Sequence, residues 1–269
     1  MTPFGVEIRD LSVRFGATTA VDTVTATIAA GAITGLLGRN ASGKSTLLAA
    51  IAAFRRPTSG RVLVDGKNPY ENPDVTAGIT LVREAGDYAD SRVSDMLQLA
   101  AAVRPTWSPE LAEHLLSRFK LPTKKLATNL SRGQRSALGA LMGLASRSPL
   151  TIFDEVYLGM DAPTRYVFYD ELLTDYTALQ RTIVISSHLI EEVERLFENV
   201  LILDEGRLLL SETAEGLRER GHRLSIQDLF VNLTGDAQGA ANDAANATVH
   251  DEANAAARAS GAQAPKEWR

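Results

Sequence analysis

The eight residues from Gly38 to Ser45 constrain the fold of this chain more than any other segment. They follow the spacing G-x-x-x-x-G-K-[ST], with Gly43 and Lys44 at the other fixed positions. The short apolar run AITGLLG comes before them, and KSTLLAAIAAF, rich in helix-forming residues, comes after them. This order predicts a buried strand, a glycine-rich turn and a helix, the arrangement that binds phosphate at a helix start.

The residue types in this turn suit a polyphosphate. Consecutive backbone N–H groups can surround phosphate oxygens only where side chains leave room, and Gly38 and Gly43 provide that room. Lys44 is expected to contact the β- and γ-phosphates, and Ser45 to offer its hydroxyl to Mg²⁺. A glycine-rich turn that matches by chance is the alternative. The strand and the helix predicted on its two sides favour phosphate binding.

The composition of the chain argues against several classes of protein. Its 269 residues include no cysteine, which excludes disulfides and thiolate metal sites and fits a reducing compartment. The formal net charge of −5 argues against nucleic acid as the main partner. The first residues, MTPFGVEIRD, lack the apolar core of a secretory signal, and no apolar run approaches the ~20 residues that span a bilayer. We expect the chain not to enter a membrane by itself.

The first part of the chain has the pattern of an antiparallel β layer. Residues 6–15 alternate apolar and polar side chains, with a change of phase near Asp10 that is typical of a bulge. Residues 20–29 are rich in Val, Thr and Ile, and residues 60–66 end in the turn signal Asp-Gly. We therefore expect three strands here.

The middle of the chain predicts helices rather than strands. One helix is expected over 91–103 and another over 108–119, where Ser108 is a suitable N-cap and a proline follows it. A third helix is expected to start near Ser131. Because no obvious strand interrupts this stretch, residues 88–147, approximately, are predicted to form a helical subdomain inserted into an α/β core.

The pattern returns to alternating strands and helices after residue 150. Continuously apolar strands of this kind are typical of a parallel sheet that is covered on both faces. Strands are predicted over 150–154, 182–187, 199–204 and 207–211, and helices over 163–179, 190–197 and 225–234. We place one domain over residues 1–235. Residues 236–269 are dominated by Ala, Asn, Asp, Gly and Gln and are predicted to be a disordered or weakly helical tail.

A pair of acids could complete the phosphate site. The sequence LTIFDE is an apolar strand that ends in Asp154 and Glu155. Asp154 is placed to hold Mg²⁺ through water, and Glu155 to orient or deprotonate an attacking water. Two solvated acids at the end of a strand are the alternative.

A second helix start also carries anion-binding groups. Ser131 and Gly133, in NLSRGQRSALG, present a hydroxyl and N–H groups there. A single nucleotide has no obvious use for a second site of this kind, whereas two chains stacked head to tail do. An ordinary serine N-cap is the alternative.

Together these residues resemble the nucleotide-binding subunit of ABC transporters, over roughly residues 5–235. The motifs occur in the order that the family has. Phe15 corresponds to the aromatic residue that stacks on adenine, and GRNASGKST (38–46) corresponds to the Walker A loop. LSRGQ (130–134) corresponds to the signature loop, and LTIFDE (150–155) to the Walker B strand with the catalytic glutamate. GMD (159–161) corresponds to the end of the D-loop, and His188 to the switch histidine.

The resemblance implies an α/β fold with a P-loop core of the ABC type: a mostly parallel sheet flanked by helices, an antiparallel β layer and an inserted helical subdomain. It implies hydrolysis of ATP with Mg²⁺, with Glu155 and His188 as catalytic residues. The residues that it implies for nucleotide binding are Phe15, Gly38, Arg39, Asn40, Ala41, Ser42, Gly43, Lys44, Ser45, Thr46, Ser131, Gly133, Gln134 and Asp161. Those that it implies for Mg²⁺ are Ser45, Asp154 and Glu84.

Three departures from the family's pattern bear on turnover and coupling. Glu84 stands where the family has the glutamine of the Q-loop, and a carboxylate cannot donate a hydrogen bond unless it is protonated. Val156 replaces the usual proline after the catalytic glutamate, and Tyr157 and Leu158 replace a small polar pair. Arg132 replaces the first signature glycine, at a position that varies in the family.

The resemblance also implies partners. A second copy of the chain, or a homologous ATPase subunit, would complete the site. A separate transmembrane permease subunit would contact residues 84–104 and hold the chain, itself cytoplasmic, at the inner face of the cell membrane. The helical block resembles that of subunits of bacterial export systems. The sequence does not contain the long C-terminal β-domain of sugar importers. The transported substance is not indicated by the sequence.

Two other functions are compatible with these residues. One is a soluble ABC ATPase that serves an assembly or regulatory complex without transport. The other is an ATP-binding subunit that hydrolyses poorly, which Glu84 and Val156 suggest. His114, His222 and His250 have no motif around them and are interpreted as surface residues.

Overall fold

The computed structural model describes residues 2–83, 90–190, 194–219 and 225–235. The chain separates into two units, residues 1–223 and 224–269. In the second unit the described residues 226–235 are helical, which matches the predicted helix over 225–234. The boundary between the units precedes this helix, whereas the predicted domain boundary follows it. The predicted tail, 236–269, lies outside the described residues.

The antiparallel layer that the sequence predicts is present. Its strands follow the order β2 (Thr18–Ile28), β1 (Val6–Phe15) and β4 (Ser59–Val64). The pairing of β1 with β2 shifts between Ile8 and Leu11, and Asp10 between them has a φ of +47°. This irregularity is the predicted change of phase, because it lets apolar side chains on both sides of Asp10 reach the same core.

The second sheet has six strands in the order β5-β6-β7-β3-β8-β9. Their bounds are β5 Ile79–Arg83, β6 Leu150–Asp154, β7 Thr182–Ser187, β3 Ile33–Leu37, β8 Asn199–Asp204 and β9 Arg207–Thr213. The first five strands are parallel, and β9 returns antiparallel to β8 through a turn at Glu205-Gly206. All residues of β3, β6 and β7 are buried, as predicted from their apolar runs. Their carboxyl ends therefore meet at one edge of the sheet.

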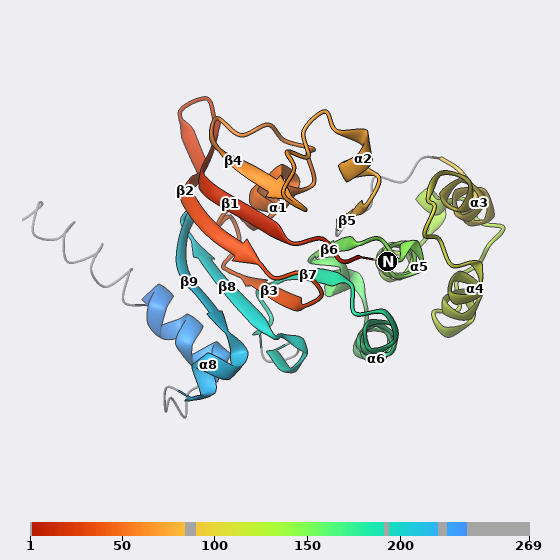
Figure 1. The fold of residues 1–269 in the computed structure, drawn as a ribbon. Coiled ribbons are helices and arrows are strands. Elements are labelled where there is room, and N and C mark those ends of the chain that lie inside the picture. Colours follow the sequence, from red (N-terminus) through yellow and green to blue (C-terminus); the bar gives the residue numbers. More distant parts are fainter. Residues whose placement is uncertain (1, 84–89, 191–193, 220–224, 236–269) are drawn as a thin grey trace, which may run out of the picture. The chain divides into compact units, whose positions relative to one another are not determined.

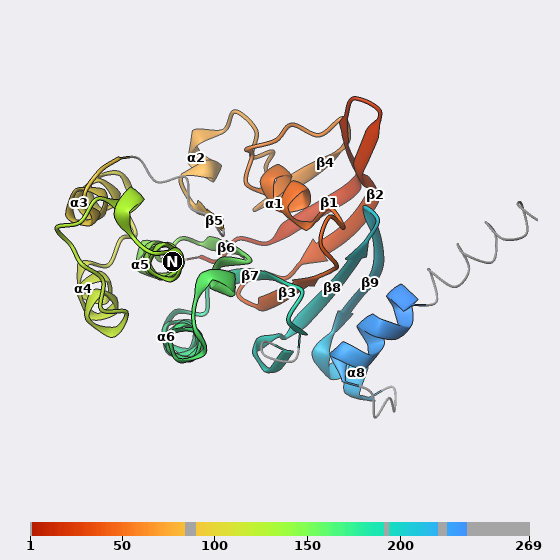
Figure 2. The same ribbon diagram turned by 180° about the vertical axis from the view of Figure 1, so that it is seen from behind.

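Helices cover both faces of this sheet. Helix α1 (Lys44–Ile51) and helix α6 (Ala162–Leu179) lie on opposite sides of β3, β6 and β7 (Figures 1 and 2). Leu47, Leu48 and Ile51 of α1 are completely buried in the hydrophobic core that joins the two sheets. Burying one such side chain contributes about 1.5–3 kcal/mol, so α1 fixes the glycine-rich turn firmly to both layers.

The block between β5 and β6 is helical, as predicted. It contains α3 (Val93–Val103), α4 (Pro109–Arg118), the short 3₁₀ helix η1 (Ala127–Asn129) and α5 (Arg132–Ser146). Ser108 caps α4, because its hydroxyl accepts a hydrogen bond from the N–H of Leu111 at 3.2 Å. In Figure 1, α5 lies between β6 and the two outer helices.

Some elements differ from the prediction. Strand β5 and helix α2 (Pro73–Thr76) were not predicted, because no motif marks these short segments. Strands β3 and β6 are also five residues long, but they precede the glycine-rich turn and Glu155, which mark them in the sequence. Of the helix predicted over 190–197, the described part contains the 3₁₀ helix η3 (Glu194–Leu196). The remaining short elements are η2 (Val156–Gly159) and α8 (Ala214–Glu219). In the described parts of the chain, no helix combines the length and the apolar character needed to cross a membrane.

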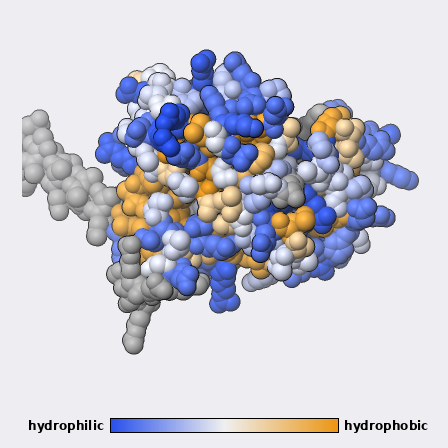
Figure 3. All heavy atoms as spheres, in the orientation of Figure 1, coloured by the Kyte–Doolittle hydropathy of each residue, from blue (hydrophilic) through white to orange (hydrophobic). Residues whose placement is uncertain are grey.

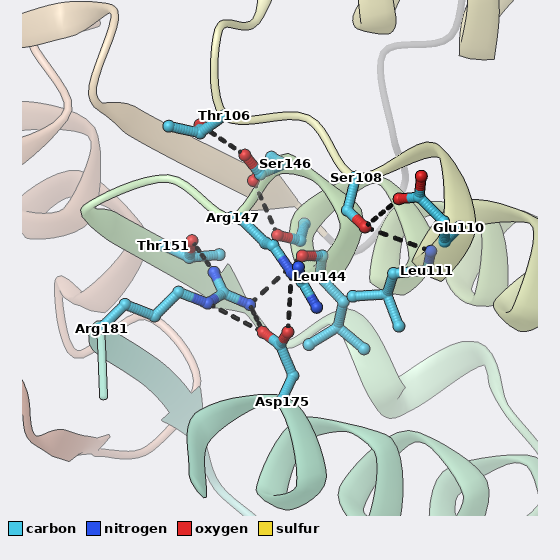
Figure 4. A network of polar contacts seen from close by, with 11 residues as sticks. Thr106, Ser108, Glu110, Leu111, Leu144, Ser146, Arg147, Thr151, Asp175 and Arg181 are labelled. Carbon is cyan, nitrogen blue, oxygen red and sulfur yellow. Dashed lines mark hydrogen bonds and ion pairs between the residues drawn. The ribbon is translucent and has the colours of Figure 1, made fainter. Parts of the chain in front are cut away.

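A buried ionic network ties three elements together at the amino ends of the strands (Figure 4). Arg181, just before β7, is completely buried and donates from Nε and Nη2 to Oδ2 of Asp175 in α6, at 3.0 and 2.8 Å. It also donates to the hydroxyl of Thr151 in β6 and to the carbonyl of Leu144 in α5. Arg147, at the end of α5, donates to Oδ1 of the same aspartate at 3.1 Å. The network therefore fixes α5 and α6 to β6.

Candidate active site

The turn between β3 and α1 has the backbone of an anion-binding loop. Ala41 and Gly43 adopt left-handed conformations, with φ of +65° and +101°. A Cβ at Gly43 would lie 2.3 Å from the carbonyl oxygen of Ala20, and one at Gly38 would lie 2.4 Å from that of Leu203. Both glycines are thus required by close packing. Alternation of right- and left-handed residues turns successive N–H groups toward one side, as in anion-binding nests.

Lys44 is held above this loop. Its side chain is only 5% exposed, and Nζ donates to the carbonyl oxygens of Gly38 and Arg39 at 2.8 and 2.9 Å. Nζ also lies 3.2 Å from Oε1 of Glu155. A buried ammonium group over a nest of N–H groups provides the positive charge that a polyphosphate needs.

The two acids at the end of β6, Asp154 and Glu155, are held by one serine from β7. Ser186 Oγ donates to Oδ1 of Asp154 at 2.6 Å, and Ser186 Oγ also accepts from the N–H of Glu155 at 3.0 Å. Glu155 has a φ of +51°, a conformation that costs about 1 kcal/mol or more for a residue other than glycine. This turn sends its carboxylate toward Lys44.

His188 completes a cluster of three charged or titratable groups. It follows β7, and Nδ1 lies 3.2 Å from the same Oε1 of Glu155 that faces Lys44. The His188 side chain is 29% exposed and the Glu155 side chain 16%. The structure thus brings together Lys44, Asp154, Glu155 and His188, four residues that the sequence singled out. A carboxylate between a lysine and a histidine can accept a proton from water and orient that water.

A pair of hydroxyls lies behind this cluster and was not foreseen as part of the site. The hydroxyl of Tyr157, in η2, donates to Oγ of Ser187 at 2.6 Å, and Ser187 Oγ also accepts from the N–H of Leu189 at 2.8 Å. Burial raises the pKa of the completely buried Tyr157 well above its usual value, so the hydroxyl stays protonated and donates. The only sign in the sequence was the departure from the family's pattern at this position.

The start of α5 forms a regular helix cap. Ser131 Oγ accepts from the N–H of Gln134 at 3.2 Å, and Gln134 Oε1 accepts from the N–H of Ser131 at 3.2 Å. A Cβ at Gly133 would lie 3.0 Å from the carbonyl oxygen of Gly159, so this glycine lets η2 approach α5. The serine N-cap that was the alternative interpretation of Ser131 is therefore real, and it leaves Ser131 at the surface.

The start of α5 does not meet the lysine cluster within one chain. Helix α5 lies beyond β5 and β6 as seen from α1 (Figures 1 and 2). Among the described residues, no hydrogen bond or ion pair connects Ser131, Gly133 or Gln134 to Lys44. The predicted site residues thus form two groups on one chain.

Phe15 and Asp161, two further predicted residues, lie at the ends of secondary-structure elements. Phe15 ends β1 and is 46% exposed, and the guanidinium of Arg55 lies 4.0 Å from its ring centroid, covering one face. Asp161 caps α6 and accepts from the N–H of Thr164 at 3.0 Å; hydrogen bonds from the side chain and the N–H of Thr164 lower the pKa of this carboxyl. Glu84 lies outside the described residues.

The loop between β3 and α1 fits the phosphates of a nucleoside triphosphate. Ser42 Oγ is buried and has no hydrogen-bond partner among the described residues, so it can serve a bound group. Ser45 is exposed on the first turn of α1, and Arg39 and Asn40 are exposed in the loop. Phosphate is an anion and is bound by hydrogen-bond donors and positive charge. The N–H groups of the loop, the Ser42 hydroxyl and the Lys44 ammonium group provide these.

The site also fits Mg²⁺ in the form in which it accompanies nucleotides. No group of three or more acidic or histidine side chains among the described residues could hold a metal ion. Mg²⁺ usually keeps several waters and takes one or two protein ligands together with phosphate oxygens. Ser45 and Asp154 offer those ligands, at the start of α1 and at the end of β6.

Of the other three histidines, only His114 lies among the described residues. His114 lies at the surface, as predicted, and its ring nitrogen is 2.9 Å from a carboxylate oxygen of Glu171. His222 and His250 lie outside the described residues.

Residues 21–157 match the sequence profile of the ABC transporter family. The chain is 28% identical over 230 residues to the ABC transporter ATP-binding protein YtrB of Bacillus subtilis, covering 85% of this chain and 79% of that protein. It is 29% identical to the bacitracin transport ATP-binding protein BcrA of Bacillus licheniformis (81% and 72% covered). It is 31% identical to the spermidine/putrescine import ATP-binding protein PotA of Nitrosomonas europaea, of which it spans 58%.

Solved structures show the same fold. One described as the ATP-binding subunit of an ABC transporter superimposes with a TM-score of 0.76 at 24% identity, covering 85% of this chain and 99% of that one. A bacterial Atm1-family ABC exporter with ATP bound gives a TM-score of 0.72 at 18% identity, covering 88% and 42%. The chain therefore belongs to the ABC transporter family, as an ATP-binding subunit whose hydrolysis of ATP energises transport.

Proposed function

We propose that two copies of this chain close head to tail around two molecules of ATP with Mg²⁺, and that closure and reopening drive a separate permease subunit. The observation that carries this proposal is the division of the site residues into two groups. One group surrounds Lys44, and the other lies at the exposed start of α5. A twofold axis places the α5 start of one copy opposite the Lys44 loop of the other, at two equivalent sites.

Each residue near Lys44 has a distinct task in this proposal. Lys44 and the N–H groups of the loop bind the phosphates, and Ser45 and Asp154 hold Mg²⁺. Glu155 orients the attacking water and accepts its proton, and His188 stabilises the charge that develops at the γ-phosphate. Bound Mg²⁺ supplies charge neutralisation on the phosphate oxygens. Positioning and electrostatics account for most of the catalysis in phosphoryl transfer.

The ion pair between Lys44 and Glu155 suits a resting state. Nζ of Lys44 has Glu155 and two carbonyl oxygens as partners. A γ-phosphate offers Lys44 a stronger, doubly charged partner, so binding frees the carboxylate of Glu155 to face water. The catalytic group thus becomes available only when nucleotide is in place.

Complementation between two inactive variants tests the head-to-tail arrangement. Lys44→Ala removes the phosphate contact, and Ser131→Arg blocks the opposite half of the site. In a mixed dimer one site carries both defects and the other carries none. A mixture of the two variants should recover up to about a quarter of the wild-type ATPase rate, since half of the dimers are mixed and each keeps one intact site.

The control for this experiment is Ser117→Arg, at an exposed serine of α4 away from the capped start of α5. This variant should hydrolyse ATP normally by itself. If the mixture of Lys44→Ala and Ser131→Arg stays inactive while Ser117→Arg is active, the two groups of residues do not share a site.

For the permease, we propose a docking place between α2 and the end of α3. A groove of about 580 Å³ there is lined by residues 52–54 after α1, by α2 and the residues beside it, and by Val103 and Arg104. Phe54 and Val103 on its border are 69% and 64% exposed. Figure 3 shows an apolar patch among hydrophilic residues on the side of the molecule that carries α3. An apolar groove of this size suits a short helix of a partner.

Co-purification from membranes tests this docking place. Val103→Glu should release the chain from the membrane fraction that contains its permease and should leave ATP binding intact. Leu173→Glu changes a 40% exposed leucine of α6 in the same way and should not release it. Equal retention of both variants would place the permease elsewhere.

For the direction of transport we propose export. The support is the resemblance of the helical block to subunits of bacterial export systems. The relatives include an import protein, PotA, so the family comparison supports transport in general. Uptake of a radiolabelled candidate substrate by inside-out vesicles, dependent on ATP, is expected for export. ATP-dependent uptake by right-side-out vesicles would mean import.

A further inference from the structure

We infer that Tyr157 is a positioning residue that holds the His188 turn in place through Ser187. The inference rests on the proposed role of His188 in ATP hydrolysis. It concerns a residue at which this chain departs from the small polar pair of the family. The hydrogen bond from the Tyr157 hydroxyl to Ser187 Oγ, at 2.6 Å, joins the segment after β6 to the end of β7.

Ser187 is the point through which Tyr157 can act. Its Oγ accepts from the N–H of Leu189 at 2.8 Å, which closes a turn with His188 at its centre. Its carbonyl oxygen accepts from the N–H of Gly38 at 3.3 Å, which ties the same residue to the phosphate loop. The backbone on both sides of His188 is therefore anchored to one serine.

Tyr157 is itself firmly held. Its side chain is completely buried, and its ring lies 6.3 Å from that of Tyr169 in α6. Its 3₁₀ helix, η2, packs against α5, where Gly133 and Gly159 allow close approach. A phenol also reaches several ångströms farther from the backbone than the hydroxyl of serine or threonine. This length lets the side chain of Tyr157, in η2, reach Ser187 at the end of β7.

The consequence falls on the geometry of His188. Nδ1 of His188 lies 3.2 Å from Oε1 of Glu155, a distance at the limit of a good hydrogen bond. A small displacement of the turn would separate the two groups. Misplacement of a catalytic group by about 1 Å can lower a rate by about a hundredfold, so a residue that fixes this turn controls turnover without touching nucleotide.

The test is steady-state ATP hydrolysis by Tyr157→Phe in the wild-type and the His188→Ala backgrounds. In the wild-type background, Tyr157→Phe should lower kcat by about tenfold and leave KM for ATP within about twofold, because the phosphate loop is unchanged. In the His188→Ala background, the same change should lower kcat by less than about twofold, because its target is gone. Ser187→Ala should reproduce Tyr157→Phe, and Ser187→Thr, which keeps the hydroxyl, should restore most of the rate.

Tyr176→Phe is the matched control. It removes a hydroxyl that donates to the carbonyl oxygen of Gly31, also at 2.6 Å. Gly31 precedes β3, so this hydrogen bond does not involve the His188 turn after β7. It should leave kcat unchanged even if it lowers the melting temperature. This separates positioning from a general loss of stability.

Three results would overturn the inference and leave the proposed role of His188 intact. They are an unchanged kcat in Tyr157→Phe, an equal loss in both backgrounds, and a similar loss of kcat in Tyr176→Phe. If His188→Ala alone keeps the full rate, the proposed role of His188 fails, and the inference fails with it. If His188→Ala is slow and Tyr157→Phe is not, only the inference fails.

Discussion

Strands β6 and β7 carry a polar cluster at each end, and the two clusters differ in how their groups are used. At the amino ends, Arg181 donates to Asp175, Thr151 and the carbonyl of Leu144, and it is fully buried. At the carboxyl ends, Lys44 and His188 share one oxygen of Glu155. The adjacent loop carries the hydroxyl of Ser42, which has no hydrogen-bond partner in the part of the chain that the structure describes.

The difference separates a structural cluster from a chemical one. Among the described residues, the buried side chains of the amino-end network all have hydrogen-bond partners within the protein. Groups at the carboxyl ends are close enough to interact but can exchange partners when phosphate arrives. Ligands in open α/β sheets generally bind at the carboxyl ends of the strands, because loops and helix starts meet there. Substitutions at the two ends should therefore change different measurements.

The largest change in stability is expected from Asp175→Ala. It leaves Arg181 buried without its carboxylate, and breaking a buried pair in this way costs about 3–5 kcal/mol. Urea unfolding should show this loss. The double variant Asp175→Leu with Arg181→Met, which removes both charges, should recover much of it. A loss below about 1 kcal/mol in Asp175→Ala would mean that the network contributes little.

Glu155→Gln should affect turnover instead. The amide cannot accept the proton of the attacking water, and loss of a general base lowers kcat by about a thousandfold. ATP binding should persist, because Lys44 and the loop remain, and the urea midpoint should stay within error of the wild type. ATPase assays and nucleotide titration check both points. An undiminished ATPase rate would remove Glu155 from its role.

Ser186→Ala should affect both measurements to a smaller extent. Its hydroxyl orients Asp154 and accepts from the N–H of Glu155, so its loss leaves a partly buried N–H without this partner. We expect a loss of about 1–3 kcal/mol in the free energy of unfolding and a fall of about tenfold in kcat. Ser186→Thr, which keeps the hydroxyl, is the control. A change in only one of the two measurements would separate the roles of this serine.

The smallest effect is expected from Ser108→Ala. Ser108 lies near the buried network in Figure 4, where it caps α4, but its hydroxyl and N–H form hydrogen bonds with Glu110, Leu111 and Ala145 rather than with Arg181 or Asp175. Loss of an N-cap costs about 1 kcal/mol. The ATPase rate should not change. A loss as large as that of Asp175→Ala would extend the network to α4.

The sequence predicted the carboxyl-end cluster better than the amino-end network. The chemistry of phosphate requires glycine, lysine and a hydroxyl at fixed spacing, and an apolar strand before Asp154 marks where the acids lie. The bulge near Asp10 and the turn at Glu205-Gly206 could also be predicted, because bulges and tight turns favour particular residues. The roles of the site residues remain predictions.

The amino-end network could not be predicted, because its contacts are set by packing. Arg181 stands between a helix and a strand, where an arginine is usually exposed, and its partner Thr151 lies far away in sequence. Strand β5 was missed because no motif marks it, whereas β3 and β6, which have the same length, precede recognisable motifs. Tyr157 was visible only as an unusual residue, and its contact with Ser187 depends on the distance between two strands.

The central claim is that two copies trap nucleotide between them, and analytical ultracentrifugation of Glu155→Gln tests it most directly. With ATP and Mg²⁺ this variant should sediment as a dimer, with ADP as a monomer, and the addition of Ser131→Arg should restore the monomer in ATP. A Glu155→Gln variant that binds ATP and remains monomeric, both alone and with its permease, would contradict the account.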